Sequence, residues 1–185
     1  MAASATRIPA AERRALLLRA AGRLFAERGY GGTRIDDIAA AAGVTKPIVY
    51  RHFESKKALY LALLDRHEAD LPGFADPGTA PRDILAVWLD YVRANSHAWI
   101  MLFRDTSGDA EIEAARRRVN ERAREVIADL IRARGGVRTA EVEPTAELLT
   151  SGLAGLALWW IEHPRVPKHV VLDVAARSAE AALAP

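Results

Sequence analysis

The sequence predicts an all-α fold of about nine helices. Hydrophobic residues recur at helical spacing along most of the chain, and the alternation of apolar and polar residues that is typical of strands is nearly absent. Stretches rich in glycine or proline separate the periodic segments. Two of the predicted helices near the N-terminus are short and joined by a tight turn. We therefore expect a small helical domain over residues 1–55 and a larger helical domain over residues 56–185.

The first predicted helix spans residues 10–28. It places Leu17, Leu24 and Phe25 on one face, at the spacing of an amphipathic helix. Gly29 follows directly and is expected to end it, because glycine is common just past the end of a helix.

Two short helices are predicted next. We expect Thr33 to cap the first and Thr45 to cap the second, which covers residues 46–52. Pro47 falls in the first turn of the second helix, where the missing N–H would have no partner in any case. Residues 34–52 therefore predict a helix-turn-helix, in which the first helix braces the second and the second lies in the major groove of DNA.

The second of these helices is expected to have one buried face and one solvent-exposed face. Val49 and Phe53 lie four residues apart and are expected to face the core. Arginine and lysine read guanine edges or bind phosphate, and apolar side chains contact thymine methyl groups. The displayed residues are Lys46, Pro47, Tyr50 and Arg51, with Ile48 and His52 at the margins.

Ser55 is expected to cap a fourth helix that ends near Leu71. The segment after it, residues 72–81, is rich in proline and glycine and is the clearest break in the chain. Beyond this break the periodicity predicts five more helices, near 81–95, 97–105, 109–134, 144–162 and 167–183.

Charge is distributed unevenly. Residues 1–60 carry 11 Lys and Arg against 5 Asp and Glu, a net charge of +6. Residues 61–185 carry 15 against 19, a net charge of −4. A basic N-terminal segment favours contact with a polyanion such as DNA.

Cysteine is absent, which excludes disulfides, thiolate zinc sites and cysteine nucleophiles and fits a reducing cytosol. The N-terminus lacks the layout of a signal peptide. The longest uncharged stretch, residues 148–161, is too short to cross a membrane as a helix. We expect a cytoplasmic protein without membrane contact.

Neither catalysis nor a bound cofactor is expected. Ser96 and His97 are adjacent, so their side chains do not face each other on a helix. His163 and His169 flank a proline-containing loop without an acidic or cysteine partner at the spacing of a metal site. The sequence therefore predicts neither an enzyme nor a metalloprotein.

The segment from Thr33 to Leu59 resembles the signature of the tetracycline-repressor (TetR) family of transcriptional regulators. The preceding segment, residues 24–30, resembles the end of the family's first helix. The matching elements are Thr33, Ile38-Ala39, Ala42-Gly43-Val44, Tyr50-x-His52-Phe53 and Ser55-Lys56-x-x-Leu59. The resemblance implies a homodimeric repressor that a small-molecule effector releases from a near-palindromic operator.

The resemblance also implies roles for individual residues. Thr33 is expected to place a hydroxyl and a helix N-terminus against a phosphate. Ile48 departs from the family pattern, in which a small residue or threonine is commoner, so the operator cannot be inferred from relatives. The residues expected to contact DNA are Thr33, Arg34, Thr45, Lys46, Pro47, Ile48, Tyr50, Arg51, His52 and Lys56. Among them, Lys46, Pro47, Ile48 and Arg51 match the positions that read bases, and Thr45, Tyr50, His52 and Lys56 those that hold the backbone.

In the family, the C-terminal helices bind a small ligand and form the dimer. Aromatic residues after position 80 are expected to line an apolar pocket, although each taken singly is more readily explained by an ordinary core. The pocket candidates are Trp88, Tyr91, Trp99, Phe103 and Trp159. Small and apolar residues at helical spacing are expected to form the dimer interface. These are Leu148, Gly152, Gly155, Trp159, Val170 and Val174.

Two alternatives remain open at this point. An architectural protein with a helix-turn-helix would bind many DNA sequences with a steep salt dependence and little specificity. A helical enzyme is the weaker alternative, because no catalytic grouping is evident.

Overall fold

The computed structural model describes residues 9–74, 76–105 and 107–184. Within these residues the chain forms nine α-helices and two short 3-10 helices, and no strand. The prediction of an all-α fold is therefore confirmed. Residues 1–8, part of the predicted N-terminal domain, lie outside the described residues.

The helices follow the predicted segments closely. Their bounds are α1 (Ala10–Gly32), α2 (Ile35–Ala41), α3 (Lys46–His52), α4 (Lys56–Asp70), η1 (Leu71–Phe74), α5 (Pro81–Ala94), α6 (Ser96–Phe103), α7 (Ala110–Arg134), η2 (Thr139–Glu141), α8 (Val142–Glu162) and α9 (Lys168–Leu183). Helical geometry within α1 is broken at Gly29, whose φ of 69° favours glycine. This is the residue at which the first helix was expected to end.

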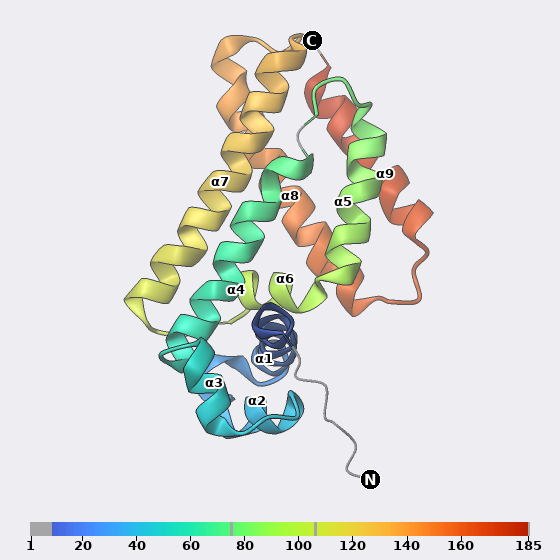
Figure 1. The fold of residues 1–185 in the computed structure, drawn as a ribbon. Coiled ribbons are helices and arrows are strands. Elements are labelled where there is room, and N and C mark those ends of the chain that lie inside the picture. Colours follow the sequence, from blue (N-terminus) through green and yellow to red (C-terminus); the bar gives the residue numbers. More distant parts are fainter. Residues whose placement is uncertain (1–8, 75, 106, 185) are drawn as a thin grey trace.

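The helices form two regions joined by α4. Figure 1 shows α1, α2 and α3 at one end of the molecule, with α4 rising from α3 into a bundle that also contains α5, α7, α8 and α9. Helix α6 lies between α1 and this bundle and contacts α1, α4, α5 and α8. Helix α4 packs on α1 and on α7, so it belongs to both regions.

A single hydrophobic core crosses the predicted domain boundary at residue 55. Leu17 of α1 and Val49 of α3 share one buried cluster with Leu64 of α4, Met101 of α6 and Ile112 of α7. Burial of this kind stabilises a fold by about 25 cal/mol for each Å² of apolar surface removed from water. The small region is therefore packed firmly against the large one.

Two of the three predicted caps differ from expectation. Arg34, and not Thr33, precedes α2 at the cap position, and the Thr33 hydroxyl donates to the carbonyls of Leu24 and Gly29 instead. Thr45 precedes α3 but its side chain accepts no capping hydrogen bond. Ser55 does cap α4, since its Oγ accepts from the N–H of Ala58 at 3.0 Å.

Within residues 9–74, 76–105 and 107–184, no helix combines the length and the apolar character needed to cross a bilayer.

Candidate DNA-binding surface and ligand cavity

Helix α3 presents the face that the sequence predicts. Val49 and Phe53 are buried against α1 and α4. The opposite side is open to solvent, and Tyr50 is 46% exposed although it is a large aromatic residue. Lys46, Pro47 and Arg51 are exposed with it, and Ile48 and His52 are half-buried.

The turn between α2 and α3 is built around Gly43. Its φ of 66° lies in the left-handed region that glycine adopts without steric cost. The N–H of Gly43 donates to Ala40 and that of Val44 to Ala39, at 3.1 and 2.9 Å. These bonds fix the angle between the two helices, so α3 is displayed by a rigid support.

Exposed ion pairs connect the helices of this region. Lys46 lies 3.1 Å from Asp36 of α2, and Arg28 of α1 lies 3.3 Å from Asp37. Exposed pairs of this kind stabilise a protein by about 1 kcal/mol or less. A phosphate or a base edge can therefore replace Asp36 as the partner of Lys46 at little cost.

Two of the predicted DNA contacts are engaged inside the protein. The Thr33 side chain is 1% exposed and its hydroxyl bonds to α1, so it does not face a phosphate as expected. The Lys56 ammonium donates to the carbonyls of Tyr30 and Thr33, at 2.7 and 3.0 Å, and lies 4.2 Å from the centre of the Tyr30 ring. In the structure, Thr33 and Lys56 thus hold the connection between α1 and α2.

His52 is only partly available. Its Nε2 atom is buried and has no hydrogen-bond partner among the described residues. The predicted contact of His52 with the DNA backbone therefore cannot use this nitrogen in the conformation seen.

The end of α6 joins the small region to the large one. Oδ2 of Asp105 accepts from the backbone N–H of Tyr30 at 3.0 Å and from the Tyr60 hydroxyl at 2.9 Å. Burial raises the pKa of Tyr60, and the neighbouring Asp105 raises it further. Tyr60 therefore stays a hydrogen-bond donor, and Asp105 connects α1, α4 and α6.

Arg116 of α7 holds the same segment from the other side. Its side chain donates from Nε to the carbonyl of Leu102 at 2.8 Å, and from Nη1 to the carbonyl of Asp105. Arg116 is buried, at 8% exposed, whereas Arg118 of the same arginine run is exposed and pairs with Asp65 and Glu68.

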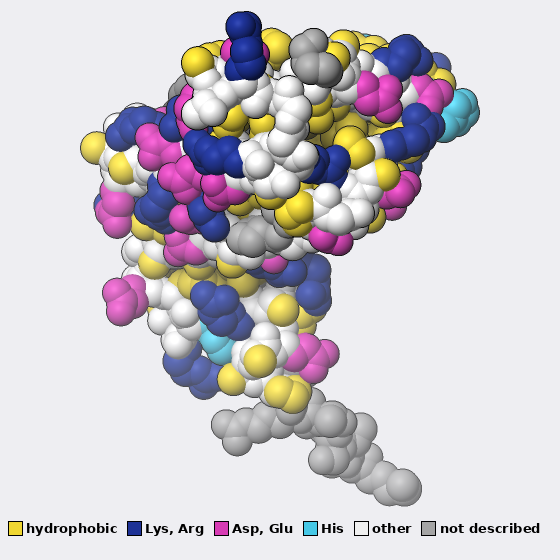
Figure 2. Space-filling view, turned by 90° about the horizontal axis from the view of Figure 1, so that it is seen from above, with side chains coloured by type: hydrophobic (Ala, Val, Ile, Leu, Met, Phe, Trp, Pro, Cys, Tyr) yellow, Lys and Arg dark blue, Asp and Glu magenta, His cyan; other side chains and the backbone are white. Residues whose placement is uncertain are grey.

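The rest of the molecular surface mixes both signs of charge. Figure 2 shows acidic and basic side chains side by side over the larger lobe of the visible face. Several of them pair across helices, for example Arg124 of α7 with Glu147 of α8 and Lys168 of α9 with Asp90 of α5. This part of the surface therefore lacks the one-sided basic character that contact with DNA requires.

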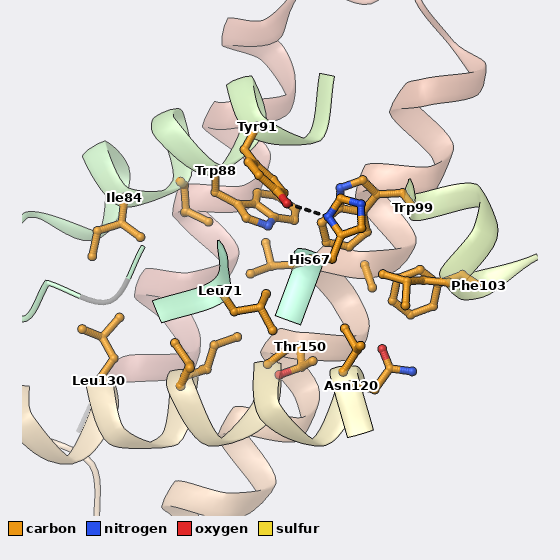
Figure 3. A pocket seen from close by; sticks show the side chains of 18 residues that line it. His67, Leu71, Ile84, Trp88, Tyr91, Trp99, Phe103, Asn120, Leu130 and Thr150 are labelled. Atoms are coloured by element: carbon orange, nitrogen blue, oxygen red, sulfur yellow. Dashed lines mark hydrogen bonds between the residues drawn. The ribbon is translucent and has the colours of Figure 1, made fainter. Parts of the chain in front are cut away.

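A cavity of about 130 Å³ lies in the large region between α4, α5, α6, α7 and α8. Its wall is largely apolar and aromatic (Figure 3). Trp88 meets Trp99 edge to face at 5.6 Å, and Trp99 stacks on Phe103 at 5.7 Å. The lining residues are His67, Leu71, Ile84, Leu85, Trp88, Tyr91, Trp99, Leu102, Phe103, Val119, Asn120, Ala123, Val126, Ile127, Leu130, Thr150, Leu153 and Ala154.

Four of the five predicted pocket residues line this cavity, namely Trp88, Tyr91, Trp99 and Phe103. Trp159 does not, because it is 43% exposed on the outer side of α8, where it stacks on His163 with ring centres 4.3 Å apart. Its neighbour Trp160 points the other way and is buried.

A chain of hydrogen bonds gives the cavity a polar end that the sequence reasoning missed. Nδ1 of His67 lies 2.6 Å from the Tyr91 hydroxyl, which donates to Oδ2 of Asp70 at 2.9 Å. The pKa of His67 is lowered to about 4, chiefly by burial, with His97 and Arg66 also lowering it and Asp70 opposing them. The sequence did contain one indication that His67 is buried, because it follows Leu63 by four residues on the apolar face of α4.

The outer face of α8 and α9 is apolar and open. Leu148 is 65% exposed, and Trp159, Val170 and Val174 are each more than 40% exposed. A Cβ atom added at Gly152 or Gly155 would meet nothing within 4 Å. All six predicted dimer residues therefore lie at the surface, in the part of the molecule that is expected to face a second subunit.

In the part of the chain that the structure describes, no group of three His, Asp or Glu side chains is arranged to hold a metal ion.

The helix-turn-helix matches a known family profile. Residues 17–63 match the profile described as bacterial regulatory proteins, tetR family. The chain is 30% identical over 168 residues to the transcriptional activator FasR of Mycolicibacterium smegmatis, covering 86% of this chain and 77% of that protein. It is 47% identical over 60 residues to the transcriptional regulator TtgR of Pseudomonas putida, covering 32% of this chain and 29% of TtgR.

Solved structures agree with the fold along almost the whole chain. A tetR-family regulator from Streptomyces coelicolor superposes with a TM-score of 0.71 at 25% identity, covering 95% of this chain and 80% of that one. A regulator from Aquifex aeolicus superposes with a TM-score of 0.79 at 17% identity, covering 91% and 98%, which shows the shared fold. The chain belongs to the tetR family of bacterial regulatory proteins and is a DNA-binding transcriptional regulator, not an enzyme.

Proposed function

We propose that this regulator is a homodimeric repressor that a small, largely apolar ligand releases from a near-palindromic operator. The observation that carries the proposal is the position of α6. Trp99 and Phe103 of this helix line the cavity, and Asp105, just beyond its end, accepts a hydrogen bond from Tyr30 of α1. A ligand that displaces α6 therefore shifts α1, and with α1 the helix-turn-helix packed on it.

Residues 1–55 are proposed as the DNA-binding domain and residues 56–185 as the domain for ligand binding and dimerisation. The continuous core between them supports the coupling, because one part cannot move without repacking the other.

The exposed side of α3 is proposed to enter the major groove. Lys46, Pro47, Ile48 and Arg51 would read bases, while Tyr50 and Thr45 hold the backbone. Arg34 at the start of α2 is exposed and suits a phosphate contact. Thr33 is buried and is not proposed to contact DNA, whereas the Lys56 ammonium keeps one N–H beyond its two internal hydrogen bonds.

The apolar outer face of α8 and α9 supports a symmetric dimer, in which the same patch of both subunits meets. Glycines 152 and 155 allow close approach of a partner helix. Two recognition helices related by a two-fold axis require operator half-sites about one helical turn (~34–36 Å) or a multiple apart.

The sense of regulation has a second candidate. FasR, which aligns with most of this chain, is named a transcriptional activator, whereas IcaR of Staphylococcus aureus, 51% identical over 37 residues, is named a negative regulator. A reporter gene behind the native promoter separates the two cases. Deletion of the regulator raises expression if it represses and lowers expression if it activates.

The DNA-binding proposal is tested by selecting genomic fragments that the purified protein retains and measuring their affinity by fluorescence anisotropy. The double variant Lys46→Ala, Arg51→Ala should weaken binding to the selected operator at least a hundredfold. The control Arg132→Ala, Lys168→Ala removes the same charge from ion-paired residues of the large region and should change the affinity less than threefold. Equal losses in the two variants would indicate a low-specificity architectural protein instead.

The release proposal is tested on the same operator. A compound that binds the protein should weaken its DNA affinity, and operator DNA should weaken the binding of the compound by the same factor, because the coupling is reciprocal. A compound that occupies the cavity and leaves the DNA affinity unchanged would contradict release.

A further inference from the structure

We infer that the cavity binds a small, uncharged aromatic molecule that carries a hydrogen-bond donor, of the phenol class, and that Nε2 of His67 accepts from that donor. The inference rests on the ligand-binding role proposed above and names the chemistry of the ligand. It follows from the direction of the hydrogen bonds at the polar end of the cavity, from the size of the cavity and from the charges around it.

The hydrogen-bond chain determines which nitrogen of His67 carries the proton. The Tyr91 hydroxyl has one proton and donates it to Oδ2 of Asp70 at 2.9 Å, because a carboxylate only accepts. Nδ1 of His67, 2.6 Å from the same hydroxyl oxygen, must therefore be the donor in that contact. A neutral imidazole has one N–H, so Nε2 of His67 holds a lone pair and can accept a hydrogen bond.

His67 is uncharged at neutral pH. Its side chain is buried, and burial lowers its pKa to about 4. The neighbouring charged and titratable groups shift the pKa of His67 in opposite directions. His97 and Arg66 lower it by disfavouring the imidazolium, and Asp70 raises it. Nε2 of His67 is thus an acceptor under the conditions in which a regulator works, and a ligand must bring the proton for this bond.

The volume and the walls favour a single ring. A cavity of about 130 Å³ is close to the ~150 Å³ of an apolar protein cavity that takes up benzene. The indoles of Trp88 and Trp99 and the ring of Phe103 offer both edges and faces, and aromatic pairs of this kind stabilise contact beyond the area that they bury.

The charges disfavour an anionic ligand. None of the described lining residues is a lysine or an arginine, so a carboxylate in the cavity would lose its hydration without gaining a cation. It would also face the lone pair of His67 Nε2, with the Asp70 carboxylate behind Tyr91. Asn120 and Thr150, the other polar lining residues, are neutral.

The test compares three probes of similar shape, namely 4-methylphenol, toluene and 4-methylbenzoate, by isothermal titration calorimetry on the full-length protein at pH 7.5. We expect 4-methylphenol to bind about tenfold more tightly than toluene, as one buried hydrogen bond supplies, and 4-methylbenzoate to bind at least tenfold more weakly than toluene. His67→Phe should reduce the affinity for 4-methylphenol to that for toluene and leave toluene within threefold.

Two further variants keep the test decisive. Tyr91→Phe retains His67 but removes the oxygen that fixes its tautomer, so the preference for 4-methylphenol over toluene should shrink; this variant carries the test if His67→Phe does not fold. Ala123→Phe fills the cavity and should abolish binding of all three probes, which locates them.

Several outcomes would overturn the inference. These are equal affinities of the wild type for 4-methylphenol and toluene, tighter binding of 4-methylbenzoate, an unchanged preference in both the His67 and Tyr91 variants, or no binding of any probe at millimolar concentration. Operator affinity, measured in parallel, separates this inference from the proposed function. Selective binding of 4-methylphenol without loss of DNA affinity contradicts release alone, whereas release by toluene and 4-methylphenol at equal affinity contradicts the ligand class alone.

Discussion

Tyr30 and Asp105 meet across 75 residues of sequence, through a hydrogen bond of 3.0 Å from the backbone N–H of Tyr30 to the Asp105 carboxylate. This bond joins the end of α1 to the end of α6. Helix α1 supports the helix-turn-helix, and α6 lines the cavity. The same oxygen also accepts from Tyr60. Because this contact is partly buried, losing the acceptor leaves the Tyr30 N–H without this partner and the Tyr60 hydroxyl with only its longer bond to the Met101 carbonyl, at 3.2 Å.

Asp105→Ala should therefore lower the free energy of unfolding by about 1–3 kcal/mol, the cost of leaving partly buried donors unpaired. Asp105→Asn should cost less, because its amide oxygen still accepts. Urea unfolding followed by circular dichroism measures both. Equal stability of wild type and Asp105→Ala would show that the contact does not hold α1 to α6.

Gly22 of α1 lies against the side chain of His97 of α6. A Cβ atom at Gly22 would lie 2.5 Å from Cδ2 of His97, inside any permitted contact. Alanine at a helical position is usually worth about 1 kcal/mol more than glycine. Here Gly22→Ala should instead destabilise the protein, by about 1–3 kcal/mol, because the ring of His97 must move.

The control is to make the same substitution in a His97→Ala protein, where removal of the ring leaves space for a methyl group at position 22. There, Gly22→Ala should be neutral or stabilising by up to about 1 kcal/mol. Thermal and urea unfolding of the four proteins gives the coupling between the two positions. Additive effects would argue against the steric account.

Acid should destabilise the protein through His67. The folded-state pKa of His67, about 4, lies below the ordinary histidine pKa of 6.5, so the folded protein binds fewer protons than the unfolded chain between these values. The stabilising contribution of the neutral side chain is complete above pH 6.5 and is lost as the pH falls toward 4, to an upper limit of about 3 kcal/mol.

His67→Gln should flatten this dependence, because glutamine does not titrate. The measurement is the free energy of unfolding by urea at pH 7.5, 6, 5 and 4.5 for both proteins. His97, whose pKa burial also lowers, titrates in both proteins, so the difference between the two curves reports His67 together with its coupling to His97. Parallel curves for wild type and His67→Gln would be inconsistent with a buried neutral His67.

The proposed dimer face allows a matched pair of substitutions. Val174 of α9 is 41% exposed on that face, and Val87 of α5 is 58% exposed elsewhere. Val174→Asp should raise the dimer dissociation constant about tenfold or more, because burying a valine contributes roughly 1.5 kcal/mol or more and a buried carboxylate costs further energy. Val87→Asp should leave the constant unchanged.

Sedimentation velocity over a range of protein concentrations measures both variants. A dimer that responds equally to the two substitutions, or to neither, would require a different interface.

Local signals in the sequence were sufficient for much of the fold. The bounds of α3 were predicted to the residue. Thr45, Pro47 and the preceding glycine turn determine where this helix starts, and they lie within a few residues of its first turn. Ser55 capped α4 as expected for the same reason. The displayed face of α3 followed from the spacing of Val49 and Phe53.

Other roles depend on residues that are distant in sequence and were missed or misassigned. Thr33 bonds back to α1, and Arg116 donates to the end of α6, a choice of partner that only the packed structure provides. The two adjacent tryptophans of α8 differ for a related reason, since Trp160 faces the core and Trp159 the outside. Periodicity alone did not show which side of α8 the cavity occupies.

Helix α4 begins at Lys56, whose ammonium donates hydrogen bonds to the α1–α2 connection. His67, which lines the cavity, follows three turns later on the same helix. At ~1.5 Å of rise per residue the two Cα atoms are about 16 Å apart along one unbroken rod. A helix that stays intact moves as a rigid body. A tilt of α4 by a few degrees near His67 would therefore displace its Lys56 end, next to α3, by about an ångström. In the proposed release mechanism, the stiffness of α4 therefore determines how much of a tilt induced at the cavity reaches the helix-turn-helix.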